Sequence, residues 1–183
     1  MHTIEPFYNW QHIYNSEHDE HSPYYGTVHS EFEFTNTVYN YYVHPQWDSF
    51  GSENLYVKIL FADYDDHCAV LEFIGEWNDV MDNDSAILKR NLIDVLIQKK
   101  IYKYILIGEN VMSLFAGDVE YYEEWYEDIR DEEGYIVMLN LNELCSYEWQ
   151  HSKIKHFVSS ADIINWRTYK PDDLFDVIEA KWL

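Results

Sequence analysis

The spacing of apolar and polar residues predicts β-strands in the first half of this chain of 183 residues. Residues 31–35 alternate strictly between charged or polar and aromatic side chains, and residues 37–43 are rich in Tyr, Val and Thr. Both patterns are typical of strands. Residues 55–64 and 68–74 are apolar runs joined by two aspartates, a pattern that indicates an antiparallel hairpin. Together these segments predict an antiparallel N-terminal meander.

From residue 84 onward, helix-like and strand-like segments alternate. Asp84 and Ser85 are typical N-terminal helix residues, and apolar side chains then recur at helical spacing as far as Leu96. A nearly continuous apolar run over 102–107 predicts a buried parallel strand. The same reasoning predicts helices over 117–129, over 142–150 and from Pro171 onward, and strands over 135–141 and 154–158. The sequence therefore predicts an α/β fold: a mixed sheet with the antiparallel meander followed by a βαβαβ unit, and helices packed against the sheet.

Length and composition predict a single domain over residues 1–183. A chain of this size can bury a substantial core, and 47% of its residues are hydrophobic, too many for a disordered chain. Only 6 Gly and 4 Pro are present, which argues against long linkers. Residues 1–27 lack periodicity, so we expect an irregular N-terminal segment whose aromatic residues pack on the body of the domain.

The chain is strongly acidic, with 34 Asp and Glu against 12 Lys and Arg and a formal net charge of −22. Such a charge repels phosphate backbones and anionic lipid, so we expect neither nucleic acid nor a membrane surface as partner. It favours cations or basic protein surfaces, and it also keeps a protein soluble without any partner. The first Lys or Arg is Lys58, and six of the nine His precede it. The N-terminal region is therefore either pH-sensitive or an ordinary surface that contains histidines.

Features that would place the chain outside the cytoplasm are missing from the sequence. Its two cysteines, Cys68 and Cys145, form neither a CxxC pair nor a disulfide framework. The chain does not open with a basic and then apolar leader, and no apolar run is long enough for a bilayer. We therefore expect a protein of the reducing cytoplasm.

Two Gly-Glu pairs that follow apolar runs form the first candidate site. Gly75-Glu76 comes after the run 68–74, and Gly108-Glu109 comes after the run 102–107. If a right-handed crossover makes the two strands parallel, both pairs turn out of the same carboxyl edge, where open α/β sheets bind ligands. The candidate ligand-binding residues at this edge are Glu76, Trp77, Asp79, Glu109 and Asn110, with Asn140 or Asn142 after the following strand.

Oxygen ligands of this kind suit a divalent cation such as Mg²⁺ or Ca²⁺. Two neighbouring carboxylates can also divide the roles of general acid and general base. The third interpretation is that they are solvated loop acids in a chain that is full of acids.

Two further segments contain residue types that are typical of binding sites. His18 and His21 could meet on one side of a helical turn and bind Zn²⁺ with a carboxylate, although the HExxH pattern is absent. Trp47 and Asp48 combine a flat ring with a carboxylate, as in sugar stacking or in an aromatic anchor at a protein interface. The alternatives are an exposed acidic turn and a tryptophan that packs a loop.

Residues 118–133 hold nine acidic residues and one basic residue, Arg130. Glu120, Glu124 and Asp128 repeat every four residues, so on a helix neighbouring like charges repel by about 0.2–0.5 kcal/mol a pair. Such a face either awaits a basic partner or is solvated and held down by the apolar residues behind it.

The chain resembles known families in two respects. Three segments, 31–37, 44–48 and 121–128, resemble those of an uncharacterised bacterial protein family with no known activity. The order of elements from Cys68 onward is similar to that of anti-sigma-factor antagonist (STAS) domains. Those domains carry an Asp-Ser pair at a helix start after the strand that here ends at Gly108. This chain has Phe-Ala-Gly-Asp at residues 115–118, without a phosphorylatable Ser or Thr, so the resemblance implies topology alone.

Two hypotheses about function remain open. No GxGxxG, GxxxxGK[ST] or GxSxG motif is present, which weakens the case for an enzyme. The leading hypothesis is a non-enzymatic binding or regulatory module that engages a protein partner through an acidic, aromatic-rich surface. The alternative is a divalent-metal-dependent hydrolase or small-ligand-binding enzyme that uses Glu76, Asp79 and Glu109 at the carboxyl edge of the sheet.

Overall fold

The computed structural model describes residues 3–182, apart from the side chain of Trp182, so the first two residues and the last residue of the predicted domain lie outside the described part. At its centre is a five-stranded sheet with the strand order β3-β4-β5-β6-β7. β3 pairs antiparallel with β4, and all the other pairs in this sheet are parallel. The strands are β3 (Leu55–Asp63), β4 (Cys68–Asn78), β5 (Lys103–Phe115), β6 (Tyr135–Leu139) and β7 (Ser159–Ala161). The predicted α/β fold with a mixed sheet is confirmed.

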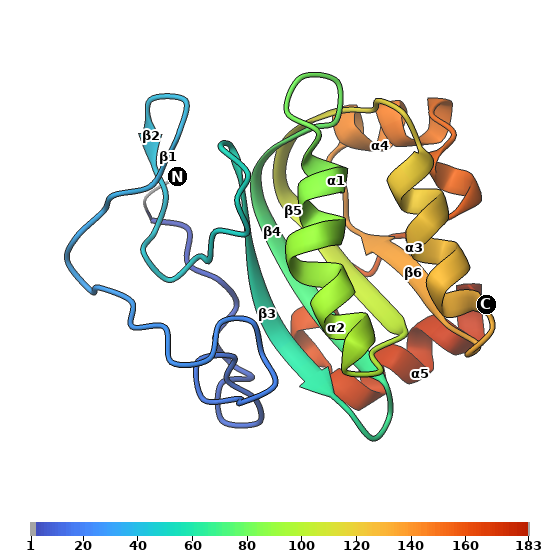
Figure 1. Cartoon of the computed structure of the whole chain (residues 1–183), viewed down its shortest axis with the longest axis horizontal. Helices are drawn as coiled ribbons and strands as arrows, with labels where there is room; N and C mark the ends of the chain where they lie inside the picture. Colours follow the sequence, from blue (N-terminus) through green and yellow to red (C-terminus); the bar gives the residue numbers. More distant parts are fainter. Residues whose placement is uncertain (1–2, 183) are drawn as a thin grey trace.

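Helices cover both faces of this sheet (Figure 1). The first face carries one long helix made of α1 (Asp84–Leu88), the π-helical turn η1 (Lys89–Ile93) and α2 (Asp94–Gln98), together with α3 (Glu120–Arg130) and α4 (Glu143–His151). The second face carries the 3₁₀ turn η3 (Trp166–Thr168) and α5 (Pro171–Trp182). None of the helices in the described part of the chain is long and apolar enough to cross a membrane.

The alternation of side chains along β4 explains the two-layer core. Phe73 and Trp77 pack in the cluster that contains α1 to α4, whereas Cys68 and Val70 pack in the cluster that contains α5. Because both faces of the sheet are covered, its central strands read as continuous apolar runs rather than as alternating ones.

The predicted strand over residues 31–35 is wrong. The Ser30 hydroxyl accepts hydrogen bonds from the backbone N–H groups of Phe32 and Glu33, at 3.2 and 2.9 Å, and these bonds hold the stretch in a turn. Within 37–43, β1 (Thr37–Val38) and β2 (Tyr41–Tyr42) form a separate two-stranded hairpin. The antiparallel part of the main sheet is therefore the β3–β4 pair.

The predicted strand over 154–158 is also wrong. Ile154–His156 forms a 3₁₀ turn, η2, and the strand β7 begins only after it. Ile154 and Val158 are four residues apart, and both are buried in the same core cluster, which is the pattern of a helical turn. The backbone N–H of Val158 donates to the carbonyl of Ile154 at 3.0 Å.

The N-terminal segment lies along the free edge of β3 (Figure 1). Residues 3–27 form turns, and no helix or strand occurs within them. Trp10 is buried between the rings of Phe7 and Trp166, with centroid distances of 5.2 and 5.7 Å, and its indole N–H donates to the Tyr169 carbonyl at 3.1 Å. The segment is thus attached to the α5 side of the sheet by aromatic packing.

Candidate functional site

Both Gly-Glu pairs lie inside strands rather than at the edge of the sheet. Gly75-Glu76 belongs to β4 and Gly108-Glu109 to β5, and each strand continues beyond its pair. The prediction that both pairs turn out of the sheet is therefore wrong. Gly75 has a φ of +123° in a bulge of β4, and a Cβ there would come within 2.0 Å of the Asn54 carbonyl oxygen. Its conformation serves a close approach of two strands, not a turn.

The carboxylates of Glu76 and Asp79 are held by separate hydrogen bonds. Glu76 accepts from the Ser113 hydroxyl on β5 at 3.0 Å. Asp79, directly after β4, accepts from the Tyr122 hydroxyl at 2.6 Å and from the Ser85 backbone N–H at 2.7 Å. Burial raises the pKa of Asp79 even though these hydrogen bonds oppose the rise. Asp79 therefore connects the first turns of α1 and α3 to the end of β4 through hydrogen bonds.

Glu109 and Asn110 belong to a third network, on the α5 side of the sheet. Glu109 accepts a hydrogen bond from the Trp166 indole N–H at 3.3 Å and forms an ion pair with Arg167. Asn110 donates to the Glu72 carboxylate at 3.3 Å. The three predicted carboxylates thus belong to three separate networks, and their role as ligand-binding residues stays a prediction.

Asn140 and Asn142, the residues expected after the next strand, shape the backbone around them. The Asn140 side chain exchanges two hydrogen bonds with the backbone of Ile163, at 2.8 and 3.0 Å. The Asn142 side chain caps α4 by accepting from the Cys145 N–H at 3.0 Å. These contacts account for both amides without a ligand.

Trp47 and Trp77 are both fully buried, so neither ring can stack on a sugar or insert into a partner. Trp77 packs in the core between Phe73 and Tyr122. The Trp47 indole N–H donates to the carbonyl of Ile4 at 2.8 Å. For Trp47 the structure therefore agrees with the alternative interpretation, a tryptophan that packs a loop.

Glu72 is a buried carboxylate outside the candidate sites expected from the sequence. It is 0% exposed in β4, accepts a hydrogen bond from the Phe7 backbone N–H at 2.7 Å and lies 3.9 Å from Arg167. Burial raises its pKa to about 7. A single acid inside the apolar run 68–74 was the signal that could have found it. Glu72 attaches the N-terminal segment to the centre of the sheet.

His18 and His21 are exposed, and neither belongs to a group of His, Cys or carboxylate side chains that could hold a metal ion within residues 3–182. The ring of His21 packs against Tyr64, with centroids 5.2 Å apart. Asp19, between the two histidines, accepts a hydrogen bond from the Tyr14 hydroxyl at 2.8 Å. Of the six N-terminal histidines, His2 lies outside the described residues.

Glu17, His29 and Asp48 form a largely buried cluster with Lys58. Within residues 3–182, the first three are the one set of His, Cys or carboxylate groups close enough to hold a metal ion, with ligand atoms within 4.8 Å of one another. His29 Nε2 lies 2.9 Å from a Glu17 oxygen and 3.0 Å from an Asp48 oxygen. The Lys58 ammonium contacts Glu17 and lies 3.0 Å from Asp48. A divalent ion would have to displace this lysine.

The four groups of this cluster balance their charges near neutral pH. Hydrogen bonds to Asp48 and Glu17 raise the pKa of His29 to about 9, so its ring is protonated. Burial favours the neutral form of Glu17, but hydrogen bonds from His29 and Lys58 lower its pKa to about 2. The cluster therefore holds two cations and two anions, and it joins the N-terminal segment to β3.

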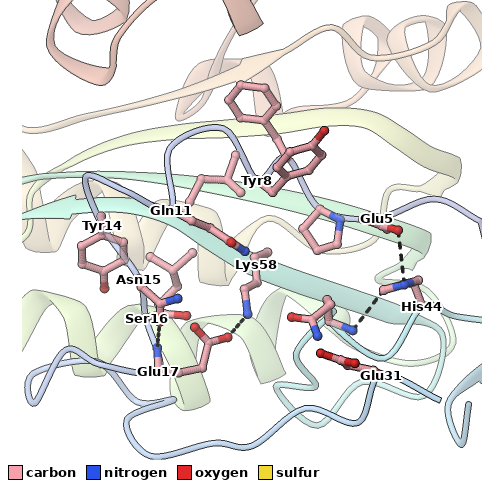
Figure 2. Close-up of a pocket in the computed structure, with 15 residues that line it drawn as sticks. Glu5, Tyr8, Gln11, Tyr14, Asn15, Ser16, Glu17, Glu31, His44 and Lys58 are labelled. Atoms are coloured by element: carbon pink, nitrogen blue, oxygen red, sulfur yellow. Dashed lines mark hydrogen bonds and ion pairs between the residues drawn. The ribbon is translucent and has the colours of Figure 1, made fainter. Parts of the chain in front are cut away.

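A cavity of about 420 Å³ lies beside this cluster, between the N-terminal segment and the edge strand β3 (Figure 2). Its walls come from residues 5–17, from Glu31, from the loop that contains His44, and from residues 58–60 of β3. Carboxylate, amide, hydroxyl and tyrosine side chains surround it, and Lys58 reaches toward it from the strand (Figure 2).

A second candidate surface lies at the carboxyl edge of the sheet, where β4 and β5 end. The turn after β4 lies against the end of β5, since the Asp79 N–H donates to the Phe115 carbonyl at 3.0 Å. The start of α4 lies against the same part of β5, since Asn142 donates to the Val111 carbonyl at 2.7 Å. These three segments carry six exposed apolar or aromatic side chains, here called the apolar edge: Val80, Met81, Met112, Phe115, Leu144 and Tyr147.

The acidic face of α3 is partly neutralised within the chain. Buried Lys89 pairs with Asp128 at 2.8 Å, and Arg90 forms two hydrogen bonds of 2.6 Å with Glu124. These cations come from η1 and offset the like-charge repulsion expected along the helix. Five acidic residues between 118 and 133 have no ion pair within the described residues: Asp118, Glu120 and Glu123 before and in the first turn of α3, and Glu132 and Glu133 after its end.

Comparison with known proteins gives matches among solved structures alone. No protein-family model and no curated protein matches the chain. Among solved structures, the anti-sigma factor antagonist SpoIIAA in its unphosphorylated form is 11% identical and covers 68% of this chain and 96% of its own, with a TM-score of 0.49. A putative anti-sigma factor antagonist from Thermotoga maritima is 14% identical and covers 67% of this chain and 92% of its own, with a TM-score of 0.46. Both likenesses concern the fold alone.

Proposed function

We propose that this chain is a non-enzymatic protein-binding module that docks a basic partner on its apolar edge. The exposure of the apolar edge is the observation that carries the proposal: Met81 is 76% exposed and Leu144 is 78% exposed. Single apolar residues are common on protein surfaces, but a group of them on adjoining segments is typical of an interface.

The charges around the apolar edge support a basic partner. Five carboxylates there have no ion-pair partner within the described residues: Asp82, Asp118, Glu120, Glu123 and Glu143. Residues 79–88, 104–129 and 140–149 contain no Lys or Arg. A partner that surrounds an apolar centre with Lys and Arg would match this arrangement, since interfaces combine an apolar core with a polar rim and complementary charge.

The alternative, a metal-dependent hydrolase that uses Glu76, Asp79 and Glu109, gains no support from the positions of these side chains. Each one is engaged with a different set of protein donors, so a metal ion would have to break three networks. Binding therefore explains the exposed groups of the molecule better than catalysis at these carboxylates.

Site-specific photo-cross-linking tests the proposal. A photo-reactive phenylalanine analogue replaces Met81, Leu144 or Asp65 in separate variants of the full chain. Each variant is expressed in the organism that naturally produces the protein. Asp65 is an exposed residue in the turn between β3 and β4, at the opposite end of β4. We expect one protein to cross-link from Met81 and from Leu144 but not from Asp65.

The salt dependence of the captured pair is the second part of the test. Its affinity should fall as ionic strength rises, because screening weakens attraction between exposed charges. Equal cross-linking from all three positions, or an affinity for the captured protein that is independent of salt, would contradict docking of a basic partner at the apolar edge.

A further inference from the structure

The cavity beside β3 is separate from the apolar edge and has the size of a small-molecule site. Its volume of about 420 Å³ lies within the range of about 300–1,000 Å³ that is usual for ligand pockets. The apolar edge contributes none of its lining residues. A ligand in this cavity would contact both the N-terminal segment and the edge strand of the sheet (Figure 2).

Polar groups on the cavity wall lack partners in the protein. The Ser16 side chain is buried, at 1% exposure of the residue, and its hydroxyl has no hydrogen-bond partner among the described residues. Buried hydroxyl groups are normally satisfied, so an orphan on a cavity wall points to a bound polar molecule. The Glu31 carboxylate, also on the wall, has no ion-pair partner within residues 3–182.

The backbone of β3 adds further polar groups to the floor of the cavity. Val57 exchanges both of its backbone hydrogen bonds with Asp48, at 2.8 and 3.0 Å, on the outer side of the strand. Because backbone groups alternate in direction along a strand, Ile59 presents its N–H and C=O to the same side, where it lines the cavity.

The charge of the cavity wall favours a cation. Glu5, Glu17 and Glu31 line it, and its one permanent cation, Lys58, is already engaged by Glu17 and Asp48. The imidazole of His44, also on the wall, lies 3.6 Å from the Glu5 carboxylate.

Aromatic rings complete the wall. Phe7, Tyr8 and Tyr14 all line the cavity. Aromatic faces attract organic cations and also pack against alkyl chains. A carboxylate without a partner, an unsatisfied hydroxyl and aromatic rings together match an alkyl ammonium group better than an anion or a neutral polyol.

We propose that this cavity binds a small aliphatic amine, with its ammonium group at the Glu31 carboxylate and its alkyl chain along the tyrosines. The amine donates hydrogen bonds that the unpaired oxygens of Glu31 and Ser16 accept. Lys58 stays in its ion-pair cluster and is not displaced.

Three four-carbon probes of matched size test the charge requirement: 1,4-diaminobutane, 1,4-butanediol and succinate. Ligand-observed NMR and isothermal titration with the full chain should give binding for the diamine that is about tenfold or more tighter than for the diol. A charge-assisted hydrogen bond commonly contributes a factor of this size. No binding of succinate is expected. Binding of the diol or of succinate as tight as that of the diamine would overturn the proposal, and so would the absence of diamine binding.

A pair of charge-matched variants separates this site from general attraction by an acidic protein. Glu31→Gln removes the carboxylate at the cavity, whereas Glu33→Gln removes an equal charge two residues away, outside the cavity. Both side chains are exposed, so both variants should fold. We expect about a tenfold loss of diamine affinity for Glu31→Gln and less than a twofold loss for Glu33→Gln. Equal losses would mean nonspecific attraction and would overturn the assignment.

Discussion

Glu72→Gln should make the protein more stable at alkaline pH and leave its stability nearly unchanged at acid pH. The Glu72 carboxylate is 0% exposed, and its partners are the Phe7 N–H at 2.7 Å and Asn110 at 3.3 Å, with Arg167 no closer than 3.9 Å. A glutamine can accept the same backbone hydrogen bond, but it carries no charge. The variant therefore imitates the protonated form of the side chain.

The magnitude follows from the pKa of Glu72, which is raised from 4.5 to about 7 in the fold by burial. Because the folded state holds this proton more tightly than the unfolded state, the unfolding free energy falls as pH rises through this interval. A difference of this size corresponds to about 3 kcal/mol. We therefore expect Glu72→Gln and the wild type to be similar near pH 4.5, and the variant to gain up to about 3 kcal/mol by pH 8.

Urea denaturation of both proteins between pH 4.5 and pH 8 measures this difference. Glu33→Gln, on an exposed residue, controls for the removal of one negative charge from a chain whose net charge is −22. A stability difference for Glu72→Gln that is the same at every pH, or that Glu33→Gln reproduces, would show that the buried charge of Glu72 does not destabilise the fold at alkaline pH.

Three other changes test the buried cluster and the bulge of β4. Lys58→Met leaves His29 as the one cation beside two buried carboxylates, so the unfolding free energy should fall by about 3–5 kcal/mol in urea denaturation. Lys99→Met, on an exposed residue, should change it by less than about 0.5 kcal/mol, and equal effects would contradict the buried cluster. Because the pKa of His29 is raised from 6.5 to about 9, its stabilising effect should be complete below pH 6.5 and lost as pH rises through 9. In urea denaturation over this pH interval, His29→Gln should therefore lose less unfolding free energy than the wild type. An equal loss in both proteins would rule the effect out. Gly75→Ala places a Cβ within 2.0 Å of a backbone oxygen, whereas a Cβ at Gly26 meets no atom of a non-neighbouring residue within 4 Å. Gly75→Ala should therefore lower the melting temperature much more than Gly26→Ala. A larger decrease for Gly26→Ala would show that the bulge relaxes easily.

The elements with clear periodicity could be predicted from the sequence. The helix that starts at Pro171 and the β3–β4 hairpin depend on local spacing and turn residues, and both are present. The ends of β4 and β5 could not be predicted from their glycines, because the strands are extended by pairing with each other as far as Asn78 and Phe115. Pairing between distant segments leaves no trace in local spacing.

For the candidate sites too, local patterns could be predicted from the sequence, but contacts between distant segments could not. Glu72 is the single charge in the apolar run 68–74, and Lys58 is the one basic residue in the run 55–64, so both were visible in the sequence. Their partners Glu17 and Phe7 lie 41 and 65 residues away along the chain, so no spacing rule could connect them. In the same way, the sequence left open whether Trp47 binds a ligand or packs a loop, because Ile4, which accepts its indole N–H, lies 43 residues away along the chain.

The affinity of the cross-linked partner for two matched double variants tests the proposed docking surface most directly. Met81→Ser with Phe115→Ser removes two side chains of the apolar edge, and Val28→Ser with Phe32→Ser removes two even more exposed apolar side chains elsewhere. We expect the first pair to weaken binding at least tenfold, since central apolar residues carry most interface energy, and the second pair to change it less than twofold. If the second pair weakens binding as much as the first, or the first has no effect, the partner does not dock on the apolar edge.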